Sequence, residues 1–398
     1  MPEGQRFSGR IISIASEKIF LTNGESVQIT PRTRLLPAQS IVQGTDILSI
    51  LLPGDLISVG DSEIHLLAPQ TQEFSLQLRA PTRERLQQFS DFLSQVRSFF
   101  QKRGFLEVQT PGLVIGPGTE PYLDVFQSEF RQGKKAQKLY LPTSPELHLK
   151  KLLAMDRGPL FEIKNCFRNG EQSPVHEPEF QMLEWYRPFS NLEAIAEDVQ
   201  AMLQTLSGQP KLSLKKQTMS GLFQQKLHFK LTPQTTLEEL QSLAKALDIS
   251  ASGSIDDVFN QIFVERIEPE LLSEEPILLH HYPPYLAAYS RLTESGWADR
   301  FEIYWKGMEL ANAFHEINDP KLQRQRMLAD LEKKRKIGKD PVPLDEEFLQ
   351  ALSSGMPPSG GIALGLERLF MCLHGIENIQ QLKAFPYARL FSAVDVVF

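Results

Sequence analysis

Residues 161–187, FEIKNCFRNGEQSPVHEPEFQMLEWYR, constrain the fold of this chain most strongly, because two alternating apolar segments flank a polar loop. Successive side chains of a strand point to opposite faces, so Glu162 and Arg168 would share a face opposite the one that holds Phe161. Four residues of the second segment share a face: Phe180, Met182, Glu184 and Tyr186. The pattern predicts a β-hairpin that directs a cation, an aromatic ring, a carboxylate and a phenol into one cavity.

These residue types indicate which ligands the hairpin could hold. Arginine suits phosphate or carboxylate groups, because its guanidinium fork stays charged and binds two oxygens at once. A carboxylate and a phenol on one face suit an ammonium ion. The same pattern is also typical of a surface hairpin with a solvated salt bridge, so this segment alone leaves both interpretations open.

The loop and its flanks resemble motif 2 of the class II aminoacyl-tRNA synthetases, in particular the lysyl type. The residues that carry this resemblance are Phe167-Arg168, His176, Pro178-Glu179-Phe180 and Glu184. Residues 99–113, FFQKRGFLEVQTPGL, are similar to motif 1, and residues 360–371, GGIALGLERLFM, are similar to motif 3. With residues 140–153 and 300–317, the resemblance covers roughly residues 85–390. It implies an α+β fold in which an antiparallel sheet is flanked by helices.

Within that family, the pattern is most similar to the short lysyl-tRNA synthetase paralogues that modify elongation factor P. The similar features are LEWYRPFSN, KGMELANAFHEI and Ala363, which stands where lysyl-tRNA synthetases usually have glycine. The resemblance implies an ATP-dependent ligase that activates lysine or (R)-β-lysine as an adenylate and transfers it to a lysine side chain of elongation factor P. Aminoacylation of tRNA and a non-catalytic synthetase paralogue are the alternatives.

Residues 1–80 differ from residues 81–398 in their pattern. Short alternating segments around Asn23-Gly24 and Pro53-Gly54 predict a small, all-β, OB-like domain, whereas longer helical periods follow. The segment 86–100 predicts a helix that ends at Gly104. The first 80 residues contain only three aromatic residues, and eight acidic against six basic residues. This composition disfavours tRNA anticodon reading and favours a structural, dimerising or docking role.

The resemblance also assigns residues to ATP and its metal ions. Arg168 would bind the α-phosphate and the substrate carboxylate, and Arg368 would lie across the adenine near the outer phosphate. The other residues on the nucleotide side are Phe180, which would stack on the adenine, together with Glu171 and His176. Glu302 and Glu309 resemble the pair that binds Mg²⁺, which prefers oxygen ligands. Gly170 stands where the family usually has glutamate, so Glu171 would reach the adenine from one residue further along.

Acidic side chains would recognise the amino acid. Glu316 and Tyr186 match the positions that hold the side-chain ammonium group in the lysyl family, and a buried ammonium requires such partners. The resemblance places Glu184 and Glu146 near the other amino group and Asn312 near the carboxylate. Ser144 and Ala363 are the remaining substrate contacts that it implies. The sequence GPGTEP at residues 116–121 lacks the GKS ending of a P-loop and predicts no phosphate site.

Bulk properties agree with a cytoplasmic enzyme. The net charge of −7 excludes a chain that is basic throughout. Cys166 and Cys372 stand apart without CxxC spacing, so we expect buried thiols and neither zinc nor a disulfide. No signal peptide or membrane-spanning stretch is expected. The basic stretch 333–336 with Lys339 would be a solvated helix face, or would dock an acidic protein or an acceptor stem. Motif 1 builds a subunit contact in this family, which implies a homodimer.

Overall fold

The structure is a computed structural model that describes residues 83–387 and six strand segments before them, at 7–15, 18–21, 26–28, 34–36, 56–59 and 63–68. The chain divides into two compact units, Met1–Gln87 and Gln88–Phe398, and each is described by itself. Within these described residues, none of the helices combines the length and the apolar character that crossing a membrane requires.

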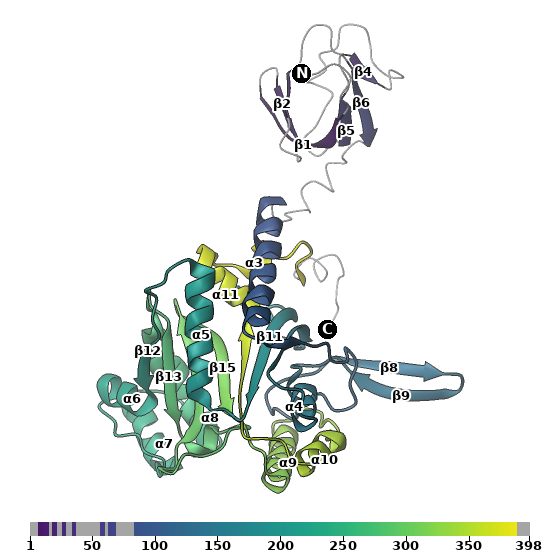
Figure 1. Ribbon diagram of the computed structural model, residues 1–398. Helices are drawn as coiled ribbons and strands as arrows, with labels where there is room; N and C mark the ends of the chain where they lie inside the picture. The colour runs from purple at the N-terminus through teal and green to yellow at the C-terminus, as the bar shows by residue number, and fades with distance from the viewer. Residues whose placement is uncertain are drawn as a thin grey trace. The chain divides into compact units, whose positions relative to one another are not determined.

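The described strands of the first unit form one sheet with the order β3-β2-β1-β5-β6-β4 (Figure 1). Its strands are β1 (Phe7–Ala15), β2 (Lys18–Leu21), β3 (Ser26–Gln28), β4 (Arg34–Leu36), β5 (Leu56–Val59) and β6 (Glu63–Ala68). Ile19, Ile57 and Ile64 are fully buried, so this sheet has an apolar side. The antiparallel pairing of β2 with β3 agrees with the predicted hairpin, although its Asn23-Gly24 turn lies outside the described residues. Closure into an OB-like barrel stays a prediction.

The second unit is built around an eight-stranded sheet with the order β12-β13-β14-β15-β16-β11-β10-β7. The strands are β7 (Leu106–Glu107), β10 (Leu160–Phe167), β11 (Glu179–Pro188), β12 (Lys215–Thr218), β13 (Ile277–Tyr282), β14 (Ala298–Trp305), β15 (Met308–His315) and β16 (Ser359–Gly365). The central pairs are antiparallel, and only the pairs β7–β10 and β12–β13 at its two edges are parallel. This sheet, flanked by helices, confirms the predicted α+β fold.

Helices cover one face of this sheet and form the main core. Those that contribute are α3 (Arg83–Lys102), α5 (Leu192–Ser207) and α11 (Leu366–His374). Phe100, Trp185 and Phe370 meet in this core, and none of the three is exposed to solvent. The predicted helix before Gly104 is confirmed, and this glycine has a φ of +78°, which suits a chain leaving a helix. Figure 1 shows α3, α5 and α11 beside the sheet.

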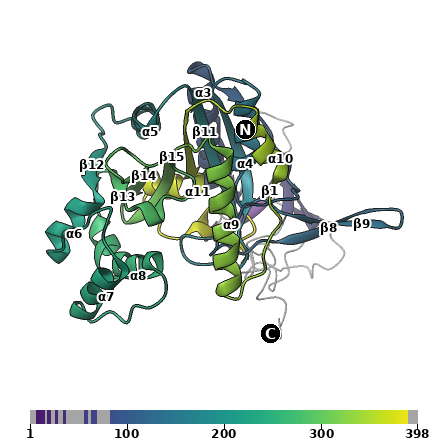
Figure 2. The same cartoon turned by 90° about the horizontal axis from the view of Figure 1, so that it is seen from below.

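Further helices surround the edges of the sheet. Helices α4 (Glu146–Ala154), α9 (Pro320–Lys336) and α10 (Glu346–Ser353) pack together through Met327 and Phe348 (Figure 2). Helices α6 (Met219–Leu227), α7 (Leu237–Ala246) and α8 (Ile255–Ile262) form a separate apolar cluster with β13. The hairpin of β8 (Gln127–Gln132) and β9 (Lys135–Tyr140) projects from the unit, and most of its residues are exposed.

The hairpin predicted from residues 161–187 is confirmed by the pairing of β10 with β11. Phe161 lies opposite Trp185, and both side chains enter the core. Glu162 lies opposite Glu184 on the other face, because directly opposed residues share a face of the sheet. The alternation of the sequence therefore separates the core side of this hairpin from the side that carries charge.

One row of opposed residues crosses five strands. Glu184 on β11 lies opposite Ala363 on β16, which in turn lies opposite Asn312 on β15. Asn312 lies opposite Glu302 on β14, so the row runs from Glu162 to Glu302. The register of the sheet thus brings residues from distant parts of the sequence to one polar face.

Candidate active site

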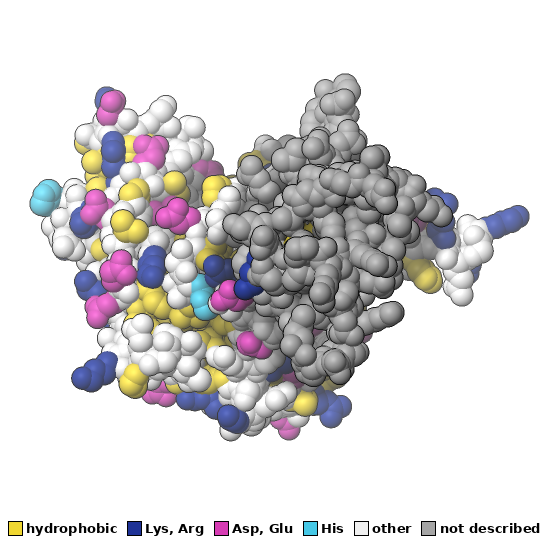
Figure 3. Space-filling view, turned by 90° about the horizontal axis from the view of Figure 1, so that it is seen from above, with side chains coloured by type: hydrophobic (Ala, Val, Ile, Leu, Met, Phe, Trp, Pro, Cys, Tyr) yellow, Lys and Arg dark blue, Asp and Glu magenta, His cyan; other side chains and the backbone are white. Residues whose placement is uncertain are grey.

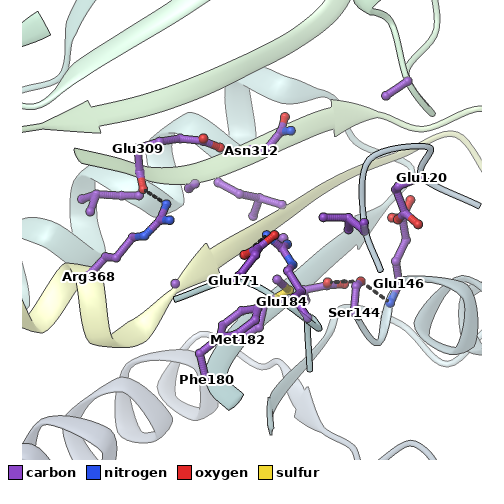
Figure 4. A pocket seen from close by; sticks show the side chains of 18 of the residues that line it. Glu120, Ser144, Glu146, Glu171, Phe180, Met182, Glu184, Glu309, Asn312 and Arg368 are labelled. Carbon is purple, nitrogen blue, oxygen red and sulfur yellow. Dashed lines mark hydrogen bonds and ion pairs between the residues drawn. The ribbon is translucent and has the colours of Figure 1, made fainter. Parts of the chain in front are cut away.

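The polar face of the sheet forms the floor of a cavity of about 430 Å³. Nearly all predicted site residues line it: Ser144, Glu146, Arg168, Glu171, His176, Phe180, Glu184, Tyr186, Glu309, Asn312, Glu316, Ala363 and Arg368. Glu302 is the one predicted residue that does not. In Figure 4, Arg368 and Glu309 lie at one side of the cavity, and Ser144, Glu146 and Glu120 lie at the other. We call the side that holds Arg368 the cationic end, although Glu309 also lies there, and the other side the acidic end.

Arg368 of α11 connects the polar loop to the sheet at the cationic end. Its Nη1 donates to the backbone oxygen of Glu309 at 2.7 Å, and its Nε donates to the backbone oxygen of Val175 at 3.3 Å. Its Nη2 donates to Nε2 of His176, whose Nδ1 lies 2.8 Å from Oγ of Ser173. The arginine and the loop therefore position each other.

His176 acts in this contact as a neutral hydrogen-bond acceptor. Burial and the neighbouring Arg368 lower the pKa of His176, because both disfavour a second positive charge. A neutral imidazole that accepts at Nε2 carries its proton at Nδ1 and donates it to Ser173. This geometry gives His176 a positioning role at the nucleotide end of the cavity.

Arg168 lies beside Phe180 and Glu171. Its Cζ is 5.1 Å from the centre of the Phe180 ring, and its Nη1 is 3.7 Å from Oε2 of Glu171. The Nε of Arg168 is buried and has no hydrogen-bond partner among the described residues. An arginine with an unused donor can bind a phosphate, and an aromatic ring beside it can contact a planar base. The two side chains together suit a nucleotide.

The acidic end is built from Glu184 and its neighbours. Oγ of Ser144 donates to Glu184 at 2.5 Å, and the Tyr186 hydroxyl donates to it at 3.0 Å. Burial and the nearby Glu146 carboxylate raise the pKa of Glu184 to about 8, because this carboxylate lacks a cation of its own. The site would therefore gain from a ligand that carries an ammonium group.

Lys150 of α4 is a functional neighbour that the sequence analysis missed. Its ammonium lies 2.5 Å from both the Glu146 and the Glu316 carboxylates, and its side chain is fully buried. Burial disfavours this charge, but the two carboxylates outweigh burial and keep the pKa of Lys150 above its ordinary value. The spacing of four residues from Glu146 is the signal that could have identified this pair.

Gly361 provides the space in which Glu316 and Tyr186 meet. A Cβ atom at this position would lie 2.3 Å from Oε1 of Glu316 and 2.3 Å from Cε1 of Tyr186. Any side chain would therefore displace the two groups predicted to hold the side-chain ammonium. The close approach explains a glycine at this point of β16.

The two carboxylates predicted to bind Mg²⁺ differ in their surroundings. Glu302 accepts hydrogen bonds from the hydroxyls of Tyr282 at 2.6 Å and Tyr304 at 2.8 Å, and it also pairs with Arg300. The Glu309 carboxylate has no hydrogen-bond partner in the described part of the chain. Burial and the Glu302 carboxylate raise the pKa of Glu309 to about 7, so a cation beside Glu309 would relieve a repulsion.

The donor set fits a magnesium ion that is held jointly with phosphates. Within the described residues, no group of three or more His, Cys, Asp and Glu side chains could hold a metal ion alone. Magnesium is usually bound by one or two carboxylates together with phosphate oxygens and water. Glu309 suits this role as it stands, whereas Glu302 would share its oxygens with the two tyrosines.

Four further acidic residues line the cavity without having been predicted: Glu120, Glu177, Asp330 and Glu367. The Thr119 hydroxyl lies 2.8 Å from the Tyr289 hydroxyl and 3.3 Å from Oδ2 of Asp330. Burial and the Glu120 carboxylate raise the pKa of Asp330 to about 7. The GPGTEP segment, which lacks the ending of a P-loop, thus contributes a carboxylate to the cavity.

The basic stretch at the end of α9 is neither a fully solvated face nor a free docking patch. The Lys334 side chain is buried, with 2% exposure, and its Nζ donates to the backbone oxygens of Glu120 and Leu123. Lys339 Nζ donates to the backbone oxygen of Tyr122 at 2.6 Å. These lysines fold back on the chain because buried carbonyl groups require donors. Cys166 and Cys372 are buried free thiols, as predicted.

Comparison with known families agrees with this geometry. Residues 70–389 match the family described as "tRNA synthetases class II (D, K and N)". This range contains every residue of the cavity and all three predicted motifs. The resemblance inferred from residues 99–113, 161–187 and 360–371 is therefore confirmed.

Several named proteins are similar to the chain over most of its length. A Proteus mirabilis protein named "Elongation factor P--(R)-beta-lysine ligase" is 37% identical over 309 residues, 75% of this chain and 93% of the relative. Proteins of the same name from Hamiltonella defensa and Haemophilus influenzae are 35% identical over 312 residues and 37% identical over 300 residues. These cover 75% and 74% of this chain, and 94% and 92% of the respective relatives. The chain belongs to the class II tRNA synthetase family of the D, K and N type.

Proposed function

We propose that this protein is an ATP-dependent ligase that activates lysine or (R)-β-lysine as an adenylate and transfers it to a lysine side chain of elongation factor P. One observation carries the proposal: a single cavity is lined by Arg168, Arg368 and Phe180 and also by buried carboxylates, with Arg368 at one side and Glu146 and Glu120 at the other. Such a cavity suits a nucleotide triphosphate and a diamino acid that meet head to tail. The names of the relatives support the choice of substrate and acceptor.

The cationic end supports activation of a carboxylate. In this reaction a carboxylate oxygen attacks the α-phosphorus of ATP, and pyrophosphate leaves. Arg168 would bind the carboxylate and the α-phosphate together, which neutralises their charges and aligns the reacting atoms. Arg368 would bind the outer phosphate beside the adenine, and His176 would hold its orientation. A bound Mg²⁺ would neutralise phosphate charge next to Glu309.

The acidic end supports selection of a diamine. Glu316 and Tyr186 would hold the ammonium group at the end of the side chain, and Glu184 and Glu146 would lie near the other amino group. Because desolvated carboxylates without a cation are costly, a ligand that brings positive charge binds in preference to a neutral one. Asn312 would donate from its side-chain nitrogen to the substrate near its carboxylate. Its side-chain oxygen is buried and has no partner among the described residues, so it could accept from a donor of the ligand.

We propose the following domain organisation and assembly for the chain. Residues 1–80 would form the OB-like domain, and residues 81–398 the catalytic domain. The motif 1 segment at 99–113 would build a homodimer contact. Acidic and basic side chains are interspersed over the coloured residues of the face in Figure 3, so these residues form no continuous basic surface of the kind that tRNA binding requires. A ligase that acts on a translation factor would work in the cytoplasm.

Two assays test the proposed function. Pyrophosphate exchange with (R)-β-lysine and with α-lysine is expected to proceed, and a non-catalytic paralogue would give exchange with neither. Incubation of the labelled adenylate with elongation factor P or with tRNA then identifies the acceptor. Label on the factor is the expected result, whereas label on tRNA alone would indicate a tRNA synthetase.

A further inference from the structure

Residues 116–124, which we call the strap, form one wall of the cavity. Glu120, Pro121 and Leu123 of the strap line it. Two lysines, one at the end of α9 and one just after it, contact the strap. Lys334 donates to the backbone oxygen of Glu120 at 3.2 Å, and Lys339 lies 2.8 Å from the carboxylate of Asp124. The strap backbone is therefore fixed, although it contains no regular secondary structure.

The Glu120 side chain folds back toward the cavity over Gly118. Gly118 has a φ of +102°, and a Cβ atom there would lie 2.5 Å from Oε2 of Glu120. The glycine thus provides both the backbone conformation and the space for the carboxylate. Figure 4 shows the side chains of Glu120 and Glu146 pointing toward one another.

Glu120 differs from the other carboxylates of the acidic end. Glu146 and Glu316 share Lys150 as an internal cation, and Glu184 accepts two hydrogen bonds. Within the part of the chain that the structure describes, Glu120 forms no ion pair and no hydrogen bond with another side chain. Burial and Glu146 therefore raise the pKa of Glu120 above its ordinary range. Arg168 and Lys334 attract the charge of Glu120 without forming an ion pair with it, so a ligand could supply a direct counter-ion.

The surroundings of Glu120 indicate which group would supply the missing charge. Arg168, the predicted partner of the substrate carboxylate, acts on the charge of Glu120, as does Glu146. A cation beside Glu120 would therefore lie close to the reacting carboxylate, and the distal ammonium would bind at Glu316 and Tyr186. The carboxylates at these two positions match the two ammonium groups of a diamino acid.

We propose that Glu120 is a specificity-determining residue, whose carboxylate receives the ammonium group nearest the carboxylate that is activated. The inference rests on the proposed function and adds a residue to its amino-acid site. It implies that the enzyme discriminates against amino acids that carry only the distal ammonium, such as 6-aminohexanoic acid. The strap then positions Glu120, and Lys334 and Lys339 hold the strap in place.

Glu120→Gln tests this proposal by pyrophosphate exchange on the full-length protein. The variant is expected to raise KM for (R)-β-lysine and α-lysine about 10- to 100-fold, the range for losing a charge-assisted hydrogen bond. KM for ATP, kcat and KM for 6-aminohexanoic acid should stay within about threefold, because neither the nucleotide nor this analogue contacts Glu120. Glu129→Gln on the exposed hairpin is the matched control and should leave every constant unchanged.

The possible outcomes separate the two proposals. If the wild-type protein exchanges with neither lysine isomer, the proposed function fails and this inference falls with it. If the wild type is active and Glu120→Gln keeps its KM for both isomers, only the inference is overturned. An equal loss with 6-aminohexanoic acid would also overturn it, since that result indicates a structural role. Glu120→Asp is the second variant in case Glu120→Gln unfolds at a lower temperature. It retains the charge and should therefore recover part of the affinity for both lysine isomers.

Discussion

The ammonium of Lys150 lies 2.5 Å from the Glu316 carboxylate, and both side chains are almost completely buried. Lys150 therefore supplies a positive charge at the bottom of the amino-acid site before any substrate arrives. A buried charge that loses its partner is costly, whereas an exposed pair contributes little. The contact between Lys150 and Glu316 therefore stabilises the empty site, whereas the carboxylates without such a cation are left to select the substrate.

Lys150→Met should destabilise the protein by about 3–5 kcal/mol, because Glu146 and Glu316 would remain buried without their cation. Urea unfolding of the full-length protein, monitored by a signal from the second unit, would measure the change in the free energy of unfolding. Lys226→Met is the control, since Lys226 pairs with Glu270 at the surface and should cost about 1 kcal/mol or less. Equal losses in the two variants would contradict the structural role of Lys150.

Gly361→Ala should abolish exchange with either lysine isomer. Its new methyl group would displace Glu316 and Tyr186, so the ammonium site could not form. Gly365→Ala is the matched control in the same strand, because the nearest atom to its Cβ would be 3.7 Å away, on Arg368. Exchange rates and melting temperatures of both variants provide the test. A fully active Gly361→Ala enzyme would refute the assigned ammonium site.

Arg168→Ala and Glu309→Ala should each reduce exchange by at least about 100-fold, a loss typical of removing one group that stabilises the transition state. Arg168 would no longer neutralise the carboxylate and the α-phosphate, and Glu309 would no longer hold Mg²⁺. Arg131→Ala on the exposed hairpin serves as the control. Near-normal rates in either site variant would contradict the assignment of that residue.

Ala363→Gly should widen acceptance of α-lysine. The Ala363 methyl lies on β16 between Glu184 and Asn312, so it narrows the floor of the cavity. Removing one methyl group should change the ratio of kcat/KM for the two isomers by about 10-fold. Ala136→Gly, at an exposed position of β9, provides the comparison. An unchanged isomer preference would show that Ala363 has no part in selection.

Asp330→Asn should change how stability depends on pH. The pKa of Asp330 is raised to about 7, so from about pH 4 to pH 7 the folded protein retains a proton that the unfolded chain has released. The free energy of unfolding therefore falls as the pH rises through this window, by up to about 1.4 kcal/mol per pH unit from this group. Asp330→Asn removes this component, so its stability relative to wild type should increase from pH 4 to pH 7. Unfolding curves at four pH values would reveal a constant difference if this account were incorrect.

Local patterns predicted much of the fold. The alternation in residues 161–187 predicted the hairpin of β10 and β11. Side-chain direction in a strand repeats every two residues, so the sequence itself separates the two faces. Motifs inherited from a family then predicted which residues line the cavity, although motif resemblance gives no distances.

The sequence by itself determined the two faces of the hairpin, the family and most of the residues around the cavity, because these follow from local periodicity and motif order. Packing of the elements was needed to bring Lys150 to Glu316, Tyr282 to Glu302, and Lys334 to the strap that carries Glu120. Each of these contacts joins segments that are distant along the chain or lie on separate elements. Which charged groups are desolvated together depends on how the elements pack, and no local pattern records that.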